Sequence, residues 1–199
     1  MDLCSICNSV LIDNYCTDCQ EFDFSNKTNG NEENKMNNSV IFFAKVRETA
    51  KIPSKLSENG AYDIYSDFEE EEIVLNPGEM KMIPSGIASA FTSDYRFILH
   101  ERGSTGTIGL ALRSGEIDTG YRGEWFVCLN NTSNKCVTIS KKYDKKCEID
   151  DVIYYPYDKA ICQANLQIVP KVNINEMDYS DLLKLKSIRM DGNLGSSGK

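Results

Sequence analysis

Histidine is almost absent from this sequence, which has a single one, His100, among 199 residues. A Ser-His-Asp or Cys-His catalytic centre would therefore have to use His100. This residue lies in RFILHE (96–101), an alternating stretch that is typical of a strand, which favours a strand-surface or interface position. The sequence thus indicates that other side chains carry any chemistry.

Long apolar runs and a surplus of positive charge are also missing. No stretch approaches the roughly 18 apolar residues of a membrane-spanning helix, and the first residues, MDLCSICNSV, lack the basic and apolar regions of a secretory signal. The net charge of −8 disfavours general binding to nucleic acid. We therefore expect a cytoplasmic protein without a membrane partner. A small polyanionic ligand fits this composition, because a few arginines and a metal ion suffice to hold it.

Four of the eight cysteines fall in the first 19 residues, as C-x2-C, eight residues, C-x2-C. Cys4, Cys7, Cys16 and Cys19 have the spacing of a tetrahedral Zn2+ site. The alternatives are unpaired surface cysteines or a redox site. A unit this short cannot build a hydrophobic core, and the bound metal would therefore supply the free energy of folding. Four thiolate ligands leave no open position, which predicts a structural zinc in a ribbon on which a protein partner docks.

The amino-acid composition changes at three points along the chain and divides it into four segments. We predict a zinc-ribbon-like module over 1–20, a polar linker over 21–38, a β core over 39–170 and a C-terminal arm over 171–199. Many short strands separated by glycine turns predict an all-β sandwich or barrel for the core. The expected strands are 40–46, 71–75, 79–84, 87–91, 95–101, 108–112, 124–130, 135–140 and 160–169, and 178–186 suggests a helical turn.

Residues 100–125, HERGSTGTIGLALRSGEIDTGYRGEW, are the most informative stretch. RGSTG (102–106) offers a guanidinium, two hydroxyls and two glycines in a turn, a composition that suits an oxyanion. SGEIDTGYRGEW (114–125) reads as a tight hairpin that holds Asp118 partly sheltered and able to activate water. Each residue alone fits an ordinary polar hairpin. Their joint density favours a functional site.

Five segments, in order, resemble the five motifs of the trimeric dUTPases, deoxyuridine triphosphate nucleotidohydrolases of phages and Gram-positive bacteria. They are GAYDIYS (60–66), RGSTG (102–106), GEIDTGYRGE (115–124), AICQANL (160–166) and RMDGNLGSSGK (189–199). The resemblance implies a distorted jelly-roll-like β barrel and a homotrimer with shared active sites. One chain would supply the first, second and fourth motifs, another the hairpin and the third the arm.

The resemblance also assigns roles to the residues around the triphosphate. Asp63 would hold Mg2+, largely through water, and Arg102 would bind phosphate. Gly103 stands where the family commonly has serine, so Ser104 is the nearest hydroxyl for the bridging phosphate oxygen. Gln163 falls on the glutamine that contacts the α-phosphate region and the water, although a strand-face position for it is an equal alternative.

The hairpin and the arm would enclose the nucleoside. Main-chain groups of the segment Ser114, Gly115, Glu116, Ile117 and Asp118 would read uracil, and Tyr121 would lie under the deoxyribose and reject a 2′-hydroxyl. In the arm, Arg189, Gly195 and Ser196 would close over the phosphates, and Leu194 would cover the base where the family has a stacking phenylalanine.

The predicted reaction is hydrolysis of dUTP to dUMP and pyrophosphate, with Asp118 activating the attacking water and Mg2+ on the triphosphate. Its role would lie in pyrimidine deoxynucleotide metabolism and in keeping uracil out of DNA. One alternative is a dCTP deaminase-like enzyme with Glu124 as acid and base. Another is a nucleotide-switched regulatory module that binds protein, with the charged segment 141–158 as a docking surface, although a solvated loop is the simpler interpretation of that segment.

Deleting residues 189–199 should abolish turnover and leave the trimer folded, because the arm closes the site and adds nothing to the core. Pyrophosphate release and size-exclusion chromatography test this. Retention of full activity by the truncated chain would contradict the role assigned to the arm.

Overall fold

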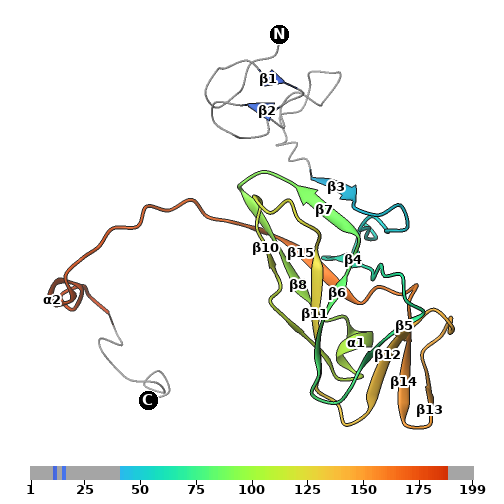
Figure 1. The fold of residues 1–199 in the computed structure, drawn as a ribbon. Coiled ribbons are helices and arrows are strands. Elements are labelled where there is room, and N and C mark those ends of the chain that lie inside the picture. The colour runs from blue at the N-terminus through green and yellow to red at the C-terminus, as the bar shows by residue number, and fades with distance from the viewer. Residues whose placement is uncertain (1–10, 13–14, 17–40, 188–199) are drawn as a thin grey trace. The chain divides into compact units, whose positions relative to one another are not determined.

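The computed structural model describes residues 11–12, 15–16 and 41–187 (Figure 1). Contacts divide the chain into two units, Met1–Val169 and Pro170–Lys199. At the start, β1 (Leu11–Ile12) and β2 (Tyr15–Cys16) form an antiparallel pair. Three of the four predicted zinc ligands (Cys4, Cys7, Cys19), the linker 21–38 and the tail residues Arg189, Leu194, Gly195 and Ser196 lie outside the described residues, so the zinc site and the arm stay predictions.

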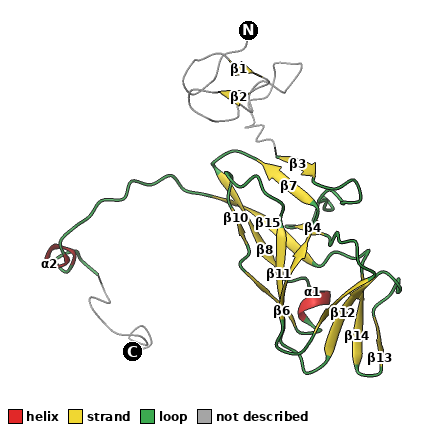
Figure 2. Ribbon diagram, in the orientation of Figure 1, coloured by secondary structure: helices red, strands yellow, loops and turns green. Residues whose placement is uncertain are grey.

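Strands make up almost all of the regular structure after residue 41 (Figure 2). None of the helices in the described part of the chain is long and apolar enough to cross a membrane. The elements are β3 (Phe42–Lys45), β4 (Tyr62–Ile64), β5 (Glu72–Leu75), β6 (Met80–Pro84), β7 (Ile87–Ala90), β8 (Tyr95–His100), α1 (Gly103–Gly106), β9 (Leu110–Arg113), β10 (Glu116–Ile117), β11 (Phe126–Asn131), β12 (Cys136–Ser140), β13 (Cys147–Ile149), β14 (Val152–Pro156), β15 (Cys162–Ile168) and α2 (Tyr179–Leu182).

Each strand predicted in the core has a counterpart in the structure, and α2 lies where a helical turn was expected. The interpretation of 141–158 as a loop was wrong, because β13 and β14 pair within it and β14 continues the sheet beside β12. The many lysine and acidic residues of this segment obscure the alternation of apolar and polar residues that would indicate strands. The turn expected at 102–106 is a single helical turn, α1. β4 and β10 are too short to produce a sequence period.

The strands form small sheets that wrap around one core. Their orders are β10-β8-β15-β4, β6-β11-β9, β13-β14-β12-β5 and β3-β7. All pairs are antiparallel except β12 with β14. This arrangement is the predicted jelly-roll-like β fold.

Aromatic rings fill the centre of the core. Phe97 of β8 lies 5.3 Å from Trp125, 5.2 Å from Phe91 and 5.7 Å from Phe43, measured between ring centroids. The indole N–H of the buried Trp125 donates to Ser89 Oγ at 3.2 Å. Such tilted and edge-on pairs add to the free energy of apolar burial, so this cluster ties the β3-β7 pair to the sheet of β8.

Gly86 follows β6 in a left-handed conformation (φ 68°), and a Cβ on it would lie 2.2 Å from Asp67 Oδ2. Gly78 has a similar φ of 78° but open space around its α-carbon. Gly78→Ala should cost about 1–2 kcal/mol of unfolding free energy for the conformation alone. Gly86→Ala should cost about 1–3 kcal/mol more, because it also displaces a buried carboxylate.

Thermal and denaturant unfolding of both variants at one protein concentration measures this difference. Equal destabilisation by the two substitutions would contradict the close packing at Gly86.

Candidate functional site

The first, second and fourth predicted segments meet in one pocket of about 530 Å³. Strand register explains this meeting. In the sheet, Gln163 of β15 lies opposite His100 of β8 on one side and opposite Asp63 of β4 on the other. Arg102 comes two residues after the end of β8, so it lies at the same end of the sheet. The lining residues are Asp63, Tyr65, Arg102, Gly103, Ser104, Asp158, Lys159, Ala160 and Gln163.

Arg102 and Asp63 form a two-pronged ion pair in this pocket. Arg102 Nε lies 3.0 Å from Asp63 Oδ1, and Nη2 donates to Oδ2 at 3.2 Å. Nη1 reaches the carbonyl oxygen of Ala160 at 3.3 Å. Both side chains remain about one-third exposed, at 29% and 33%. The guanidinium is therefore oriented yet open to solvent, the state in which a phosphate can compete for it.

The hydroxyl of Ser104 is already engaged. It lies 3.1 Å from the Tyr155 hydroxyl, which in turn donates to the carbonyl oxygen of Ala160 at 2.8 Å. Since the Tyr155 proton is used there, Ser104 donates to Tyr155. Ser104 must rotate away from Tyr155 before it can donate to a phosphate oxygen.

Gln163 faces the pocket and not merely a strand surface. Its Nε2 donates to the carbonyl oxygen of Glu101 at 3.1 Å. The Glu101 carboxylate accepts the Leu112 N–H at 2.7 Å, and this hydrogen bond lowers the pKa of Glu101. Glu101 thus ties the chain segment before Arg102 to β9, which fixes the backbone on which Gln163 rests.

The predicted hairpin at 114–125 is wrong in its pairing. β10 pairs with β8, Ile117 lying opposite Phe97, and not with the residues that follow it. A turn then closes with the Tyr121 N–H donating to the Asp118 carbonyl at 3.1 Å. Asp118 is exposed, so this chain alone does not provide the shelter that was expected. Local hydrophobicity could not show that β8 was the partner.

Asp118 and Tyr121 do not line the pocket. Asp118 comes one residue after the pair Ile117 and Phe97, which places it level with Arg96 in the antiparallel register. Arg102 lies six residues further along the chain, a separation of about 20 Å at 3.3 Å per strand residue. Ser114, Gly115, Glu116 and Ile117 share this other region, where Glu116 pairs with Arg96 at 2.6 Å. One chain does not unite the two halves of the predicted site.

The pocket fits the predicted Mg2+ position in its donor chemistry. Among the described residues, no three His, Cys, Asp or Glu side chains gather as a metal site. Mg2+ with a triphosphate commonly uses only one or two carboxylates and keeps several waters. Asp63 suits this role, and Asp158, held by Lys51 at 2.6 Å, lies in the same pocket.

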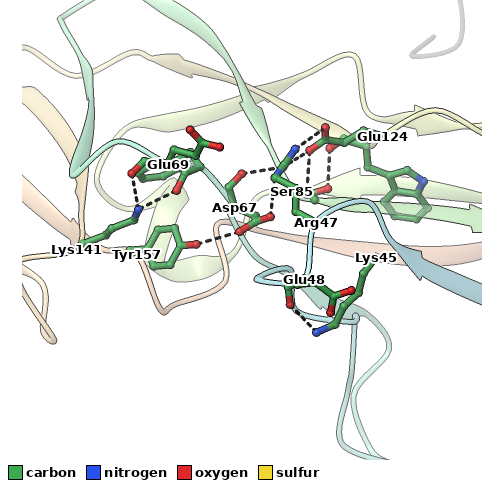
Figure 3. Close-up of polar contacts among 12 residues, drawn as sticks. Lys45, Arg47, Glu48, Asp67, Glu69, Ser85, Glu124, Lys141 and Tyr157 are labelled. Carbon is green, nitrogen blue, oxygen red and sulfur yellow. Dashed lines mark hydrogen bonds and ion pairs between the residues drawn. The ribbon is translucent and has the colours of Figure 1, made fainter.

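A second arginine fork escaped sequence reasoning (Figure 3). Arg47 donates from Nε to Asp67 Oδ2 at 2.8 Å and from Nη1 to Glu124 Oε2 at 3.0 Å. Glu124 also accepts the Gly86 N–H at 2.7 Å, and Tyr157 donates to Asp67 at 3.2 Å. Arg47, Asp67 and Glu124 are far apart in the sequence and follow no regular spacing. No sequence motif therefore indicates that they meet.

The cluster holds Glu124 as an anion. The hydrogen bonds between Arg47 and Glu124 lower the pKa of Glu124, and the same hydrogen bonds raise the pKa of Arg47. Burial raises the pKa of Tyr157, and Asp67 adds to the increase. A deaminase acid must carry a proton toward its substrate, whereas both carboxylate oxygens of Glu124 accept hydrogen bonds from Arg47. The sequence-based alternative role for Glu124 is therefore not supported.

The scattered cysteines are free, and Cys128 and Cys162 are buried. Burial strongly raises the pKa of the Cys162 thiol, which belongs to β15 beside Gln163. It is therefore a core residue and not a nucleophile.

This site, with a forked arginine, a carboxylate and an amide at one end of a jelly-roll β fold, defines a phosphate-binding enzyme. No family model matches the chain. It is 33% identical over 110 residues to a deoxyuridine 5'-triphosphate nucleotidohydrolase of Thermoanaerobacter sp. (strain X514), covering 52% of this chain and 74% of the relative. It is 27% identical over 151 residues to the enzyme of that name from Mycolicibacterium gilvum, covering 74% and 87%.

Solved structures share the fold. A mutant dUTPase of Staphylococcus bacteriophage 80alpha with dUpNHpp superimposes with a TM-score of 0.63 at 20% identity, covering 80% of this chain and 99% of that one. EIAV dUTPase superimposes with a TM-score of 0.54 at 16% identity, covering 70% and 98%. The chain belongs to the dUTPase family.

Arg102→Gln should weaken binding of inorganic pyrophosphate with Mg2+ by about 10- to 100-fold, because charge-assisted hydrogen bonds contribute about 1.5–3 kcal/mol. Titration calorimetry measures this. Lys135→Gln removes a positive charge from a pair with Glu148 elsewhere on the protein and serves as the control. Equal weakening by both variants would indicate a loss of general charge and not of a specific contact.

Proposed function

We propose that the protein is a dUTP diphosphatase, which converts dUTP and water to dUMP and pyrophosphate. The observation that carries the proposal is the pocket in which Asp63, Arg102 and Gln163 converge. The membership of this chain in the dUTPase family supports dUTP as the substrate. The similar phage dUTPase structure with dUpNHpp supports the same assignment. The role that follows is removal of dUTP from the pyrimidine deoxynucleotide pool in the cytoplasm.

In the pocket, the triphosphate displaces one ion pair. Arg102 turns from Asp63 to a phosphate oxygen, which it can do because the pair is partly exposed and strongly solvated. Asp63 is then free to hold the waters of Mg2+, which when bound neutralises charge on the leaving pyrophosphate. Ser104 rotates from Tyr155 toward the phosphates, and the amide of Gln163 orients the α-phosphate and the water.

The two carboxylates of the pocket are already engaged, Asp63 in holding Mg2+ and Asp158 with Lys51, so the reaction requires a further base. Asp118 accepts a proton from the water while the water oxygen attacks the α-phosphorus. The bond between the α-phosphorus and the oxygen that bridges to the β-phosphate breaks, which releases pyrophosphate. Because Asp118 lies level with Arg96, six residues or about 20 Å of chain before Arg102, we infer that a second copy of the chain supplies it. A homotrimer with the arm of the third chain completes three such sites.

The region around β10 suits recognition of the nucleoside. Ser114 has a left-handed conformation (φ 53°), and a side chain on Gly115 would lie 2.7 Å from the Leu99 carbonyl oxygen. This constrained backbone through Glu116 and Ile117 presents fixed main-chain groups to uracil. Tyr121, which is 44% exposed, offers its ring to the deoxyribose and leaves no room for a 2′-hydroxyl.

We also propose roles for the ends of the chain. Arg189, Leu194, Gly195 and Ser196 close over the nucleotide, and Cys4, Cys7, Cys16 and Cys19 bind a structural Zn2+ in a ribbon that docks a protein partner. Metal analysis should find one zinc per chain, and a pull-down with and without residues 1–38 tests docking. Absence of zinc from the purified protein would refute the ribbon.

A pyrophosphate-release assay with dUTP, UTP, dTTP and dCTP in the presence of Mg2+ tests the function directly. We expect strong preference for dUTP. Ammonia release from dCTP would instead support the deaminase alternative. No hydrolysis of any of the four nucleotides would leave only a nucleotide-binding or regulatory role.

Asp118→Asn should leave dUTP binding nearly intact and remove most turnover, by roughly 100-fold or more, because the amide cannot accept the water's proton. Single-turnover kinetics and binding of a non-hydrolysable analogue measure the two effects. Turnover at the original rate would contradict the role of Asp118.

The sharing of sites has its own test. Asp118→Asn and Arg102→Gln subunits are mixed under conditions that exchange chains. Random assembly should place both native residues in about one quarter of the sites and restore activity accordingly, because each site combines two different chains of a cyclic oligomer. No recovery in exchanged mixtures would place both residues in one chain's site.

A further inference from the structure

We propose that Arg47 and Glu124 are positioning residues that hold Tyr121 in place and thereby set the preference for deoxyribose over ribose. The proposal rests on the dUTP diphosphatase function argued above. Neither residue lines the pocket, and the link runs through a chain of hydrogen bonds that starts at Arg47, just after β3, and ends at the Tyr121 hydroxyl.

The first link joins the ring to the backbone beside it. The Tyr121 hydroxyl donates to the carbonyl oxygen of Glu124 at 2.8 Å. The ring is folded so closely over this segment that a Cβ on Gly123 would lie 2.7 Å from the tyrosine oxygen. The position of the ring therefore follows the position of the backbone at residues 123 and 124.

The second link fixes that backbone through the Glu124 side chain. This side chain is only 13% exposed. Both carboxylate oxygens accept hydrogen bonds from Arg47, and Oε1 also accepts the Gly86 N–H at 2.7 Å. The next residue is anchored too, because the Trp125 N–H donates to the Ile87 carbonyl oxygen at 2.8 Å. Glu124 thus holds the chain shortly after the exposed turn that carries Tyr121.

The third link anchors Arg47 itself. Its guanidinium donates to the Asp67 carboxylate and to the Asp67 carbonyl oxygen, both at 2.8 Å. The Asp67 side chain is 3% exposed, and its backbone N–H donates to the Pro84 carbonyl oxygen at 2.8 Å. Figure 3 shows Arg47 between the two carboxylates, with Asp67 toward Tyr157 and Glu124 on the opposite side.

The two carboxylates therefore differ in what they control. Both bind the same guanidinium, but only Glu124 carries the carbonyl that accepts the Tyr121 hydroxyl. Steric rejection of the 2′-hydroxyl requires the Tyr121 ring to be placed accurately. Small misplacements of groups in a site change reaction rates by large factors. Loss of the Glu124 anchor should relax discrimination, whereas a change in the Asp67 side chain should matter much less, because Arg47 still donates to the Asp67 carbonyl oxygen and to Glu124.

The test compares Glu124→Gln with Asp67→Asn, two isosteric changes on the same arginine. The readout is kcat/KM for dUTP divided by kcat/KM for UTP. We expect this ratio to fall by about tenfold in Glu124→Gln and to stay within about twofold of the native value in Asp67→Asn. A purely structural defect would lower both kcat/KM values in proportion and leave their ratio unchanged.

Tyr121→Phe identifies the path. It removes the hydroxyl link, so the ratio should fall, and adding Glu124→Gln to it should lower the ratio little further. Circular dichroism and size-exclusion chromatography verify folding and assembly of each variant. If Glu124→Gln does not assemble, Arg47→Lys replaces it, because lysine keeps the charge and cannot bridge two carboxylates.

An unchanged ratio in a folded Glu124→Gln or Arg47→Lys protein would overturn the proposal, as would additive effects with Tyr121→Phe or an equal loss in Asp67→Asn. These results are distinct from failure of the proposed function, which would appear as absence of dUTP hydrolysis in the native protein.

Discussion

The register between β8 and β15 is the constraint on which the rest of the site depends. It places Gln163 opposite His100, and β4 then brings Asp63 opposite Gln163. A slip of one residue would turn every side chain of the strand to the other face and disperse these groups. The aromatic cluster around Phe97 opposes such a slip, because Phe97 is completely buried against Trp125 and Phe91. Packing in the core thus determines the chemistry at the strand's end.

The same strand explains why one chain does not unite the two halves of the proposed site. β8 carries the phosphate pocket after its last residue and pairs with β10 nearer its beginning. A rigid strand keeps those two regions apart, so no local rearrangement brings Asp118 to Arg102. In the proposed homotrimer, joining them through a second copy would avoid distortion of the sheet and would make assembly a condition for catalysis. The exposure of Asp118 in the single chain is consistent with this division.

The sequence predicted most of the strands and five residues of the pocket, Asp63, Arg102, Gly103, Ser104 and Gln163, and the reason is local. Asp63, Arg102 and Gln163 lie in short segments whose order along the chain and resemblance to the dUTPases mark them together. Pairing partners are not local, so the hairpin at 114–125 and the loop at 141–158 were assigned wrongly. Arg47 and Glu124 are 77 residues apart and meet only after β3 pairs with β7 and β11 with β6.

The two arginine forks also show how burial divides structural from functional charge. Arg102 and Asp63 are each about one-third exposed, so water compensates either partner when the pair opens. Arg47 is similarly exposed, but Asp67 has only 3% of its side chain in solvent. Separating that pair would leave a buried carboxylate without compensation, which is strongly unfavourable. The first fork can therefore exchange its partner for a phosphate, and the second can serve only as a fixed reference for the loop that carries Tyr121.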